Sequence, residues 1–339
     1  MKINCIYVSN NLISTYQNET LQLLANELLT FGLTFNSVKF IKNDSEQILS
    51  CLKEDHADLN IVVTDCNLFF NAESYNAVII SDNVNELKQN FLDYIVPHII
   101  STNATETTRL KLFGISQNDI TNAVKDIVDA NPNIKLSILS DELDTTLVVS
   151  YDKSTDQQQL NNYIASIYER LRKFIYSDDD TTLFQLSLDL LTIGNKTLSV
   201  LETITGGNIS KEFSLCNFPN SIITQDIVVN NETTLVKEYG VNPNIIKKYG
   251  LVSVETTYEI ASTMLEKSPN DVVLVTCGDI QDNKNVCYIA IGDIEGIHVY
   301  KNSYSGSKKQ IVNTISKCAV FYLVKKLKQN DLFFNKIYV

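Results

Sequence analysis

Short apolar runs alternate with helical patterns along the N-terminal third of the chain. The runs, each typical of a buried parallel strand, lie at 3–8, 35–41, 59–64 and 77–80. Between the first two runs one apolar helix face is formed by Leu21, Leu24, Ala25 and Leu28, at the spacing i, i+3, i+4, i+7. A second helix is expected at 45–52. This alternation predicts a β-α-β layer, which we place in a first domain at 1–104.

A polar segment at 101–108 separates the first domain from a shorter block of predicted strands and helices. Strand, helix, two strands, helix and a short strand are predicted in that order at 109–113, 120–128, 134–139, 143–151, 163–171 and 174–176. We place this block in a second domain at 105–176. The third domain, 177–339, begins with a predicted helix at 181–191 and ends with one at 310–327. Its predicted strands lie near 198–201, 272–276, 286–291 and 297–301. The whole chain is expected to be α/β.

Composition narrows the possible functions. Lys and Arg number 28 against 40 Asp and Glu, so the net charge is −12 and nucleic acid is not an expected partner. Seven cysteines stand singly and there are three histidines, which indicates neither a disulfide framework nor a metal site. We expect no cofactor. No apolar run reaches the ~18 residues of a membrane helix, so we expect a cytoplasmic protein with no membrane partner.

The segment 198–210 carries the strongest chemical signal. It is predicted to run from a strand through a hydroxyl-rich turn into a helix, and Gly206-Gly207 is the one paired glycine of the chain. Two glycines let a ligand approach the backbone, and free N–H groups at a helix start favour an anion. Thr203 and Thr205 add hydroxyl groups. The alternative is an ordinary turn with a helix cap.

Further motifs follow this segment in a definite order. After 201–207 they lie at 218–221, 230–232, 239–241, 249–253, 286–290 and 305–308. In order and spacing they resemble A-E-S-x-T-G-G, V-P-G-S, Y-S-N-E, L-G-V, H-G-A-V-S, G-T-V-Y-I-A and S-G-D-R of the CinA family of competence/damage-inducible proteins. Segments 14–32 and 109–115 also resemble that family, so the resemblance covers nearly the whole chain.

The resemblance implies a fold and an activity for each domain. Residues 1–104 would form a shortened molybdopterin-binding-like domain of the ADP-ribose pyrophosphatase type, and 105–176 a small KH-like α/β domain. Residues 177–339 would form a CinA C-terminal domain of the nicotinamide mononucleotide amidohydrolase (deamidase) type. A homodimer is also implied.

The resemblance further implies where an amidase site would lie. Thr203 takes the position of the family's nucleophilic serine, while the supporting lysine falls on Thr234 or Leu235, leaving Lys237 as a nearby substitute base. The implied positions for binding a small nucleotide-like or anionic ligand are Thr205, Gly206, Gly207, Asn230, Thr276, Gly278, Lys308 and Lys309.

Departures from the family decide between the hypotheses. The loop at 64–67 lacks the family's glycines and paired acids, so we expect no ADP-ribose pyrophosphatase activity. Because the lysine after 230–232 is missing, we favour a binding or scaffold protein with degenerate active sites that keeps a ligand pocket. The alternative is a working amidohydrolase on nicotinamide mononucleotide with Thr203 as nucleophile. A third possibility is an unrelated α/β protein that matches by chance.

Overall fold

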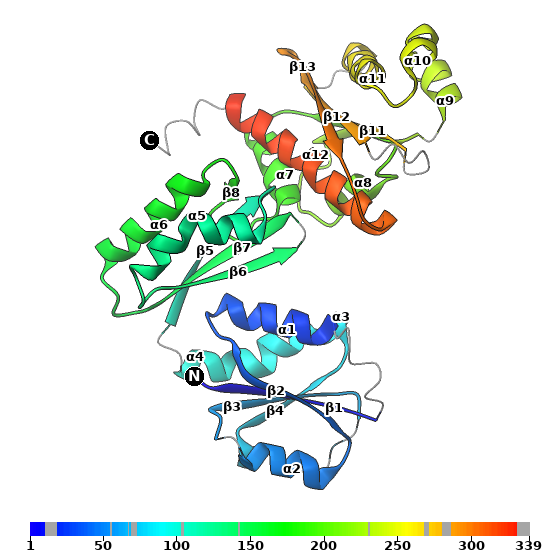
Figure 1. Ribbon diagram of the computed structural model, residues 1–339. Coiled ribbons are helices and arrows are strands. Elements are labelled where there is room, and N and C mark those ends of the chain that lie inside the picture. Colours follow the sequence, from blue (N-terminus) through cyan, green and yellow to red (C-terminus); the bar gives the residue numbers. More distant parts are fainter. Residues whose placement is uncertain are drawn as a thin grey trace. The chain divides into compact units, whose positions relative to one another are not determined.

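The protein has a mixed α/β structure with three β-sheets, in agreement with the predicted class (Figure 1). The computed structural model describes residues 1–10, 19–54, 56–66, 68, 73–102, 105–141, 143–229, 231–267, 271–279 and 286–330. No helix in these ranges is long and apolar enough to cross a membrane. They also contain no cluster of three or more His, Cys, Asp or Glu side chains that could hold a metal ion.

The first sheet consists of four parallel strands in the order β2-β1-β3-β4. The strands are β1 (Ile3–Ser9), β2 (Phe35–Lys42), β3 (Leu59–Thr64) and β4 (Ala77–Ser81). They coincide with the four apolar runs, and β1 and β3 are buried along their whole length. Burial on both faces explains why β1 and β3 are mostly apolar, whereas β2, at the sheet edge, alternates between half-buried and exposed residues.

Helices cover both faces of this sheet. One face packs against α1 (Glu19–Thr30) and a helical segment made of α3 (Val84–Asn90), the π-helix Phe91–Ile95 and α4 (Val96–Thr102). The opposite face packs against α2 (Ser45–Glu54), as Figure 1 shows. A short 3-10 helix, Glu73–Tyr75, precedes β4.

The second sheet has the strand order β6-β7-β5-β8. Its elements are β5 (Thr105–Phe113), α5 (Gln117–Asp129), β6 (Lys135–Asp141), β7 (Asp144–Asp152), α6 (Gln157–Leu171) and β8 (Ile175–Ser177). The predicted sequence of strands and helices is confirmed. The β-α-β-β-α-β order is that of the ferredoxin-like, split β-α-β arrangement, and the KH-like assignment is not confirmed.

The third sheet has five strands in the order β10-β9-β11-β12-β13. They are β9 (Leu198–Glu202), β10 (Ile223–Val228), β11 (Val272–Gly278), β12 (Val286–Asp293) and β13 (Gly296–Ser303). The first three in that order run parallel, and β12 and β13 are antiparallel. The strands β9 and β11 therefore end side by side, with Thr276 paired to Glu202.

Two groups of helices cover this sheet (Figure 1). On one face lie α9 (Glu232–Lys237), α10 (Pro243–Tyr249) and α11 (Val254–Lys267), which share a core with Leu201 and Val275. On the other lie α7 (Leu183–Ile193), α8 (Asn208–Ser214) and the long α12 (Lys308–Asn330). Glu202 and Thr276 point to this second face, because side chains alternate along a strand.

The larger differences between the predicted and the observed elements concern β5 and β10. β5 begins at Thr105, inside the segment predicted as a polar connection, because its threonines are β-branched and suit a strand. β10 was not predicted, since it lies at a sheet edge and most of its residues are exposed. The chain divides into two compact units, 1–110 with 116–140 and 145–178, and 111–115 with 141–144 and 179–339. The three domain boundaries stay a prediction.

Candidate functional site

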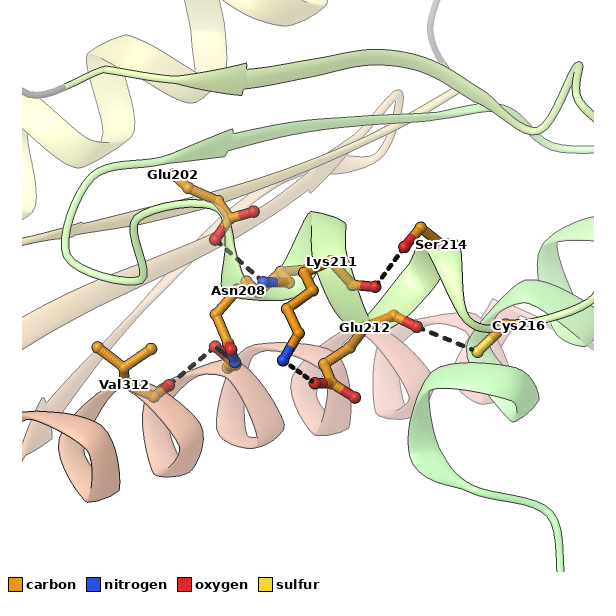
Figure 2. Close-up of polar contacts among 9 residues, drawn as sticks. Glu202, Asn208, Lys211, Glu212, Ser214, Cys216 and Val312 are labelled. Carbon is orange, nitrogen blue, oxygen red and sulfur yellow. Dashed lines mark hydrogen bonds and ion pairs between the residues drawn. The ribbon is translucent and has the colours of Figure 1, made fainter. Parts of the chain in front are cut away.

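A buried charged residue ends the central strand β9. Glu202 has 0% of its surface exposed. Its carboxylate accepts hydrogen bonds from the backbone N–H groups of Gly207 (3.0 Å), Ile209 (3.1 Å) and Ser210 (2.9 Å). Figure 2 shows the Glu202 side chain pointing to the start of α8. The first N–H groups of a helix lack partners within the helix and carry partial positive charge, so this carboxylate satisfies them.

The turn between β9 and α8 requires glycine at two successive positions. Gly206 and Gly207 have φ values of 58° and 92°, in the left-handed region where a Cβ is costly. The Gly207 N–H donates to Glu202, and the Gly206 N–H donates to the Thr203 carbonyl at 3.2 Å. Both amides that we expected to be free for a ligand therefore have acceptors within the chain. An anion placed at this turn would meet the Glu202 carboxylate.

The hydroxyl of Thr203, the candidate nucleophile, is bonded to the end of β11. Thr203 Oγ1 donates to the Gly278 carbonyl at 3.2 Å and accepts from the Gly278 N–H at 3.0 Å. The Thr203 N–H donates to the Thr276 carbonyl at 3.0 Å. In the described part of the chain, both of these hydrogen bonds of the hydroxyl are to backbone groups of Gly278, and the Thr203 side chain also lies close enough to the Cys277 thiol to lower its pKa.

Two predicted binding residues form a buried hydroxyl pair. Thr205 Oγ1 and Thr276 Oγ1 are 2.7 Å apart, and the residues are 2% and 0% exposed. The pair joins the β9–α8 turn to β11 behind the Thr203 hydroxyl. Because the two buried hydroxyls are hydrogen-bonded to each other, they stabilise the turn and are not available to bind a ligand.

Cys277 is the other nucleophile-type side chain at this strand end. It is fully buried, and its thiol donates to the Leu251 carbonyl at 3.2 Å. Burial raises the pKa of the Cys277 thiol to about 11. The thiolate is therefore scarce at neutral pH, and Cys277 is a core residue rather than a reactive one.

The start of α12 is tied to the same edge of the sheet. The Tyr304 hydroxyl donates to the Asp279 carbonyl at 2.8 Å, one residue beyond Gly278. Three residues later Ser307 begins a capping box with Gln310, and the exposed Lys308 and Lys309 occupy the first turn of the helix. Lys308 and Lys309 are thus exposed cationic side chains at the start of α12, shortly after the residue that is bonded to Asp279.

The remaining predicted residues lie apart from Thr203 or outside the described ranges. Lys237 is exposed at the end of α9, and the structure gives it no contact with Thr203 in the part of the chain that it describes. Leu235, one of the two positions for the missing lysine, is 1% exposed in the core under α11. Asn230 lies outside the described residues.

Sequence reasoning assigned no role to Glu202, Ser210 and Asp226. Ser210 Oγ lies between the carboxyl groups of Glu202 and Asp226 and is hydrogen-bonded to both. A hydroxyl has one proton, so it can donate to only one carboxylate at a time. The pKa of Asp226 is raised by partial burial and by the Glu202 charge, against the lowering effect of the Ser210 hydrogen bond. The sequence did contain one indication of this role, since Glu202 directly follows an apolar run and precedes the Gly206-Gly207 pair.

Comparison with known proteins places this site in a family. Residues 180–327 match the family model described as the CinA C-terminal domain. A putative competence-damage inducible protein of Caldicellulosiruptor bescii is 24% identical over 254 residues, which cover 71% of this chain and 62% of that protein. One of the same description from Halothermothrix orenii is 25% identical over 284 residues, covering 79% and 68%.

A solved structure gives a weaker likeness. The competence or damage-inducible protein of Enterobacter asburiae is 18% identical, with a TM-score of 0.41, and covers 44% of this chain and 99% of that one. The chain spans about three fifths of the length of the first curated relative. The matched domain contains β9, the Gly206-Gly207 turn and most of α12. Residues 180–327 of this chain therefore belong to the CinA C-terminal domain family.

Proposed function

We propose that the C-terminal domain is a CinA-type domain that binds a small nucleotide-like or anionic ligand at the carboxyl ends of β9 and β11 and does not hydrolyse it. The observation that carries the proposal is the bonding of Thr203. Its hydroxyl is occupied by the N–H and the carbonyl of Gly278, at 3.0 and 3.2 Å. A hydroxyl becomes a nucleophile when a base removes its proton, and a backbone carbonyl cannot do so.

The surroundings of Thr203 support loss of catalysis. The family lysine falls on Thr234 or Leu235, and Leu235 is a core residue. Lys237 is directed to solvent at the end of α9. The β-methyl of a threonine also restricts its χ1 angle compared with serine, which limits the directions of attack.

The ligand contacts in this proposal come from the strand ends and from α12. Open parallel sheets bind ligands at the carboxyl ends of their strands, where β9 and β11 end together. Since Glu202 holds the Gly207 amide and the first amides of α8, we assign the negative group of the ligand to Lys308 or Lys309, the positions that the family resemblance implies. The segment that precedes these lysines is tied to the end of β11 by the hydrogen bond from the Tyr304 hydroxyl to the Asp279 carbonyl.

The competing function is amide hydrolysis of nicotinamide mononucleotide, with Thr203 as the nucleophile. Its favourable feature is a half-buried hydroxyl at the end of a central parallel strand, next to a glycine turn. This function requires a base that reaches Thr203 Oγ1 when the ligand is bound.

Ammonia release and ligand binding distinguish the two functions. We expect the protein with nicotinamide mononucleotide to release no ammonia above a blank in a coupled glutamate dehydrogenase assay. Calorimetry should detect binding of the same compound, weakened at least fivefold by the double change Lys308→Ala, Lys309→Ala. Lys247→Ala, an exposed lysine on α10, is the control and should bind like the unchanged protein. Thr203→Ala should bind with similar affinity.

Two results would contradict the proposal. Rapid ammonia release that Thr203→Ala abolishes would establish the amidohydrolase instead. Absence of measurable binding of both nicotinamide mononucleotide and inorganic phosphate would exclude an anion-binding pocket.

A further inference from the structure

We propose that a cavity between α5 and α6 binds a small uncharged polyhydroxylated molecule, a sugar or polyol. The cavity has a volume of about 410 Å³. Eight residues line it: Ile127, Asn131, Asp156, Gln158, Gln159, Asn162, Tyr163 and Ser166. All of them belong to the first compact unit, so this site is separate from the turn at Thr203. The volume lies in the usual range for small-molecule sites.

The cavity has an apolar base and a polar rim. Ile127 and Tyr163 are 7% and 2% exposed, and both belong to the packed faces of their helices. The side chains of Gln158, Gln159 and Asn162 are exposed around them. Such an arrangement offers a sugar ring a surface for its C–H groups and hydrogen-bonding groups for its hydroxyls.

The Tyr163 hydroxyl is the unsatisfied polar group among the residues that line the cavity. It is buried and has no hydrogen-bond partner among the described residues. An unsatisfied buried hydroxyl costs free energy, and such groups in native proteins require an explanation. Burial raises the pKa of Tyr163 to about 12, so the hydroxyl keeps its proton at neutral pH and remains a hydrogen-bond donor.

The rim is partly organised before any ligand binds. Gln159 Nε2 donates to Asn131 Oδ1 at 3.1 Å, and Asn131 Nδ2 donates to the Ile127 carbonyl at 2.9 Å. Asp156 caps α6 by accepting from the Gln159 N–H at 2.8 Å. The side chains of Gln158 and Asn162 make no hydrogen bond to other described residues, which leaves two carboxamides able to donate and accept.

Charge selects the class of ligand. No lysine, arginine or histidine lines the cavity, and Asp156 contributes the one carboxylate. A phosphate or carboxylate ligand would find no cation here and would be repelled by Asp156. Carboxamides and hydroxyls both donate and accept, which matches a ligand whose hydroxyl groups do the same. An uncharged polyhydroxylated molecule therefore fits better than a nucleotide.

Ligand-detected NMR on the full chain tests the proposal. Saturation-transfer difference spectra would be recorded with glucose, N-acetylglucosamine, maltose and, as the charged comparison, glucose 6-phosphate. We expect transfer to at least one neutral sugar and none to the phosphate. Tyr163→Phe should weaken that binding about fivefold by removing one hydrogen bond. Because the hydroxyl has no partner in the free protein, this variant should keep the original melting temperature.

Neighbouring asparagines on α6 provide a matched pair of variants. Asn162→Ala removes a side chain that lines the cavity and should weaken binding, whereas Asn161→Ala removes one that does not and should leave it unchanged. Thr203→Ala should also leave it unchanged. The proposal is overturned if no neutral sugar shows transfer at millimolar concentration. It is equally overturned if Tyr163→Phe and Asn162→Ala bind as well as Asn161→Ala.

Discussion

The residue that organises the candidate site is Glu202, not the hydroxyl beside it. A carboxylate with no exposed surface is expensive unless every oxygen is hydrogen-bonded. Here three backbone N–H groups and the Ser210 hydroxyl supply the bonds. The Glu202 carboxylate therefore occupies the start of α8, where the sequence predicted that an anionic ligand would bind.

Glu202→Gln should destabilise the C-terminal unit by about 3 kcal/mol, because hydrogen bonds to a charged acceptor are lost and a carboxamide N–H₂ group would face backbone donors. Urea unfolding followed by circular dichroism measures the change. The control is Glu212→Gln on α8, a half-buried glutamate that pairs with the exposed Lys211 at 3.5 Å, and this change should alter stability by less than about 0.5 kcal/mol. Equal effects of the two changes would show that Glu202 does not support the turn.

At this scale the sequence revealed the hydroxyl groups but not their partners. Thr203, Thr205 and Thr276 were expected in one place, and they do meet, because parallel strands end at the same edge of a sheet. That Thr205 and Thr276 would satisfy each other depends on the register between β9 and β11, which no local pattern encodes. The burial of Glu202 likewise depends on α8 folding back over it.

At the scale of elements, apolar periodicity predicted most strands and the long last helix. Apolar periodicity did not predict strands whose side chains are buried on one face only or are mostly exposed. β10 has the sequence Ile-Thr-Gln-Asp-Ile-Val, in which polar residues interrupt the apolar ones, and it lies at a sheet edge. Such a strand is held by backbone pairing to β9, so its sequence needs no continuous apolar run. α12 was predicted at 310–327 and extends over Lys308–Asn330.

The start of α12 offers a prediction about an element. Ser307 Oγ accepts from the Gln310 N–H at 3.4 Å, and Gln310 Oε1 accepts from the Ser307 N–H at 3.0 Å. Ser307→Ala removes half of this capping box and should cost about 1 kcal/mol. Because two lysines at a helix N-terminus oppose its dipole, this turn depends on its cap.

Hydrogen exchange of the peptide that contains Lys308 and Lys309 measures the effect of Ser307→Ala. We expect faster exchange in the first turn of α12 and weaker binding of the anionic ligand proposed for that site. Ser305→Ala, an exposed serine two residues earlier, is the control and should exchange at the original rate. Unchanged exchange in Ser307→Ala would mean that packing on α7 alone fixes the start of the helix.

At the scale of the whole molecule, the chain carries a net charge of −12, and its two proposed ligand sites differ in the charge of their side chains. The turn at Thr203 needs lysines for an anion, whereas the cavity between α5 and α6 contains no cation and suits a neutral ligand. The chain also divides into two compact units, and the hydrophobic core around Phe91 and the one around Leu201 each consist of residues from a single unit. Each of the three sheets has its own run of strands, whereas the three-domain division stays a prediction. The limits of the compact units, which cut through β5, depend on packing that is distant in sequence.

Two matched core variants test whether the units are stabilised independently. Phe91 and Phe213 are both fully buried, and each packs against one phenylalanine, Phe31 at 5.9 Å and Phe184 at 5.6 Å between ring centroids. Truncating either to alanine should cost about 3–5 kcal/mol in its own unit. In peptide-resolved hydrogen exchange, Phe91→Ala should expose the amides of β1 and β3 and leave β9 and β11 protected. Phe213→Ala should do the reverse, because a cavity weakens the contacts that surround it. If either change unprotected all four strands to the same extent, the two cores would have to unfold as one cooperative body.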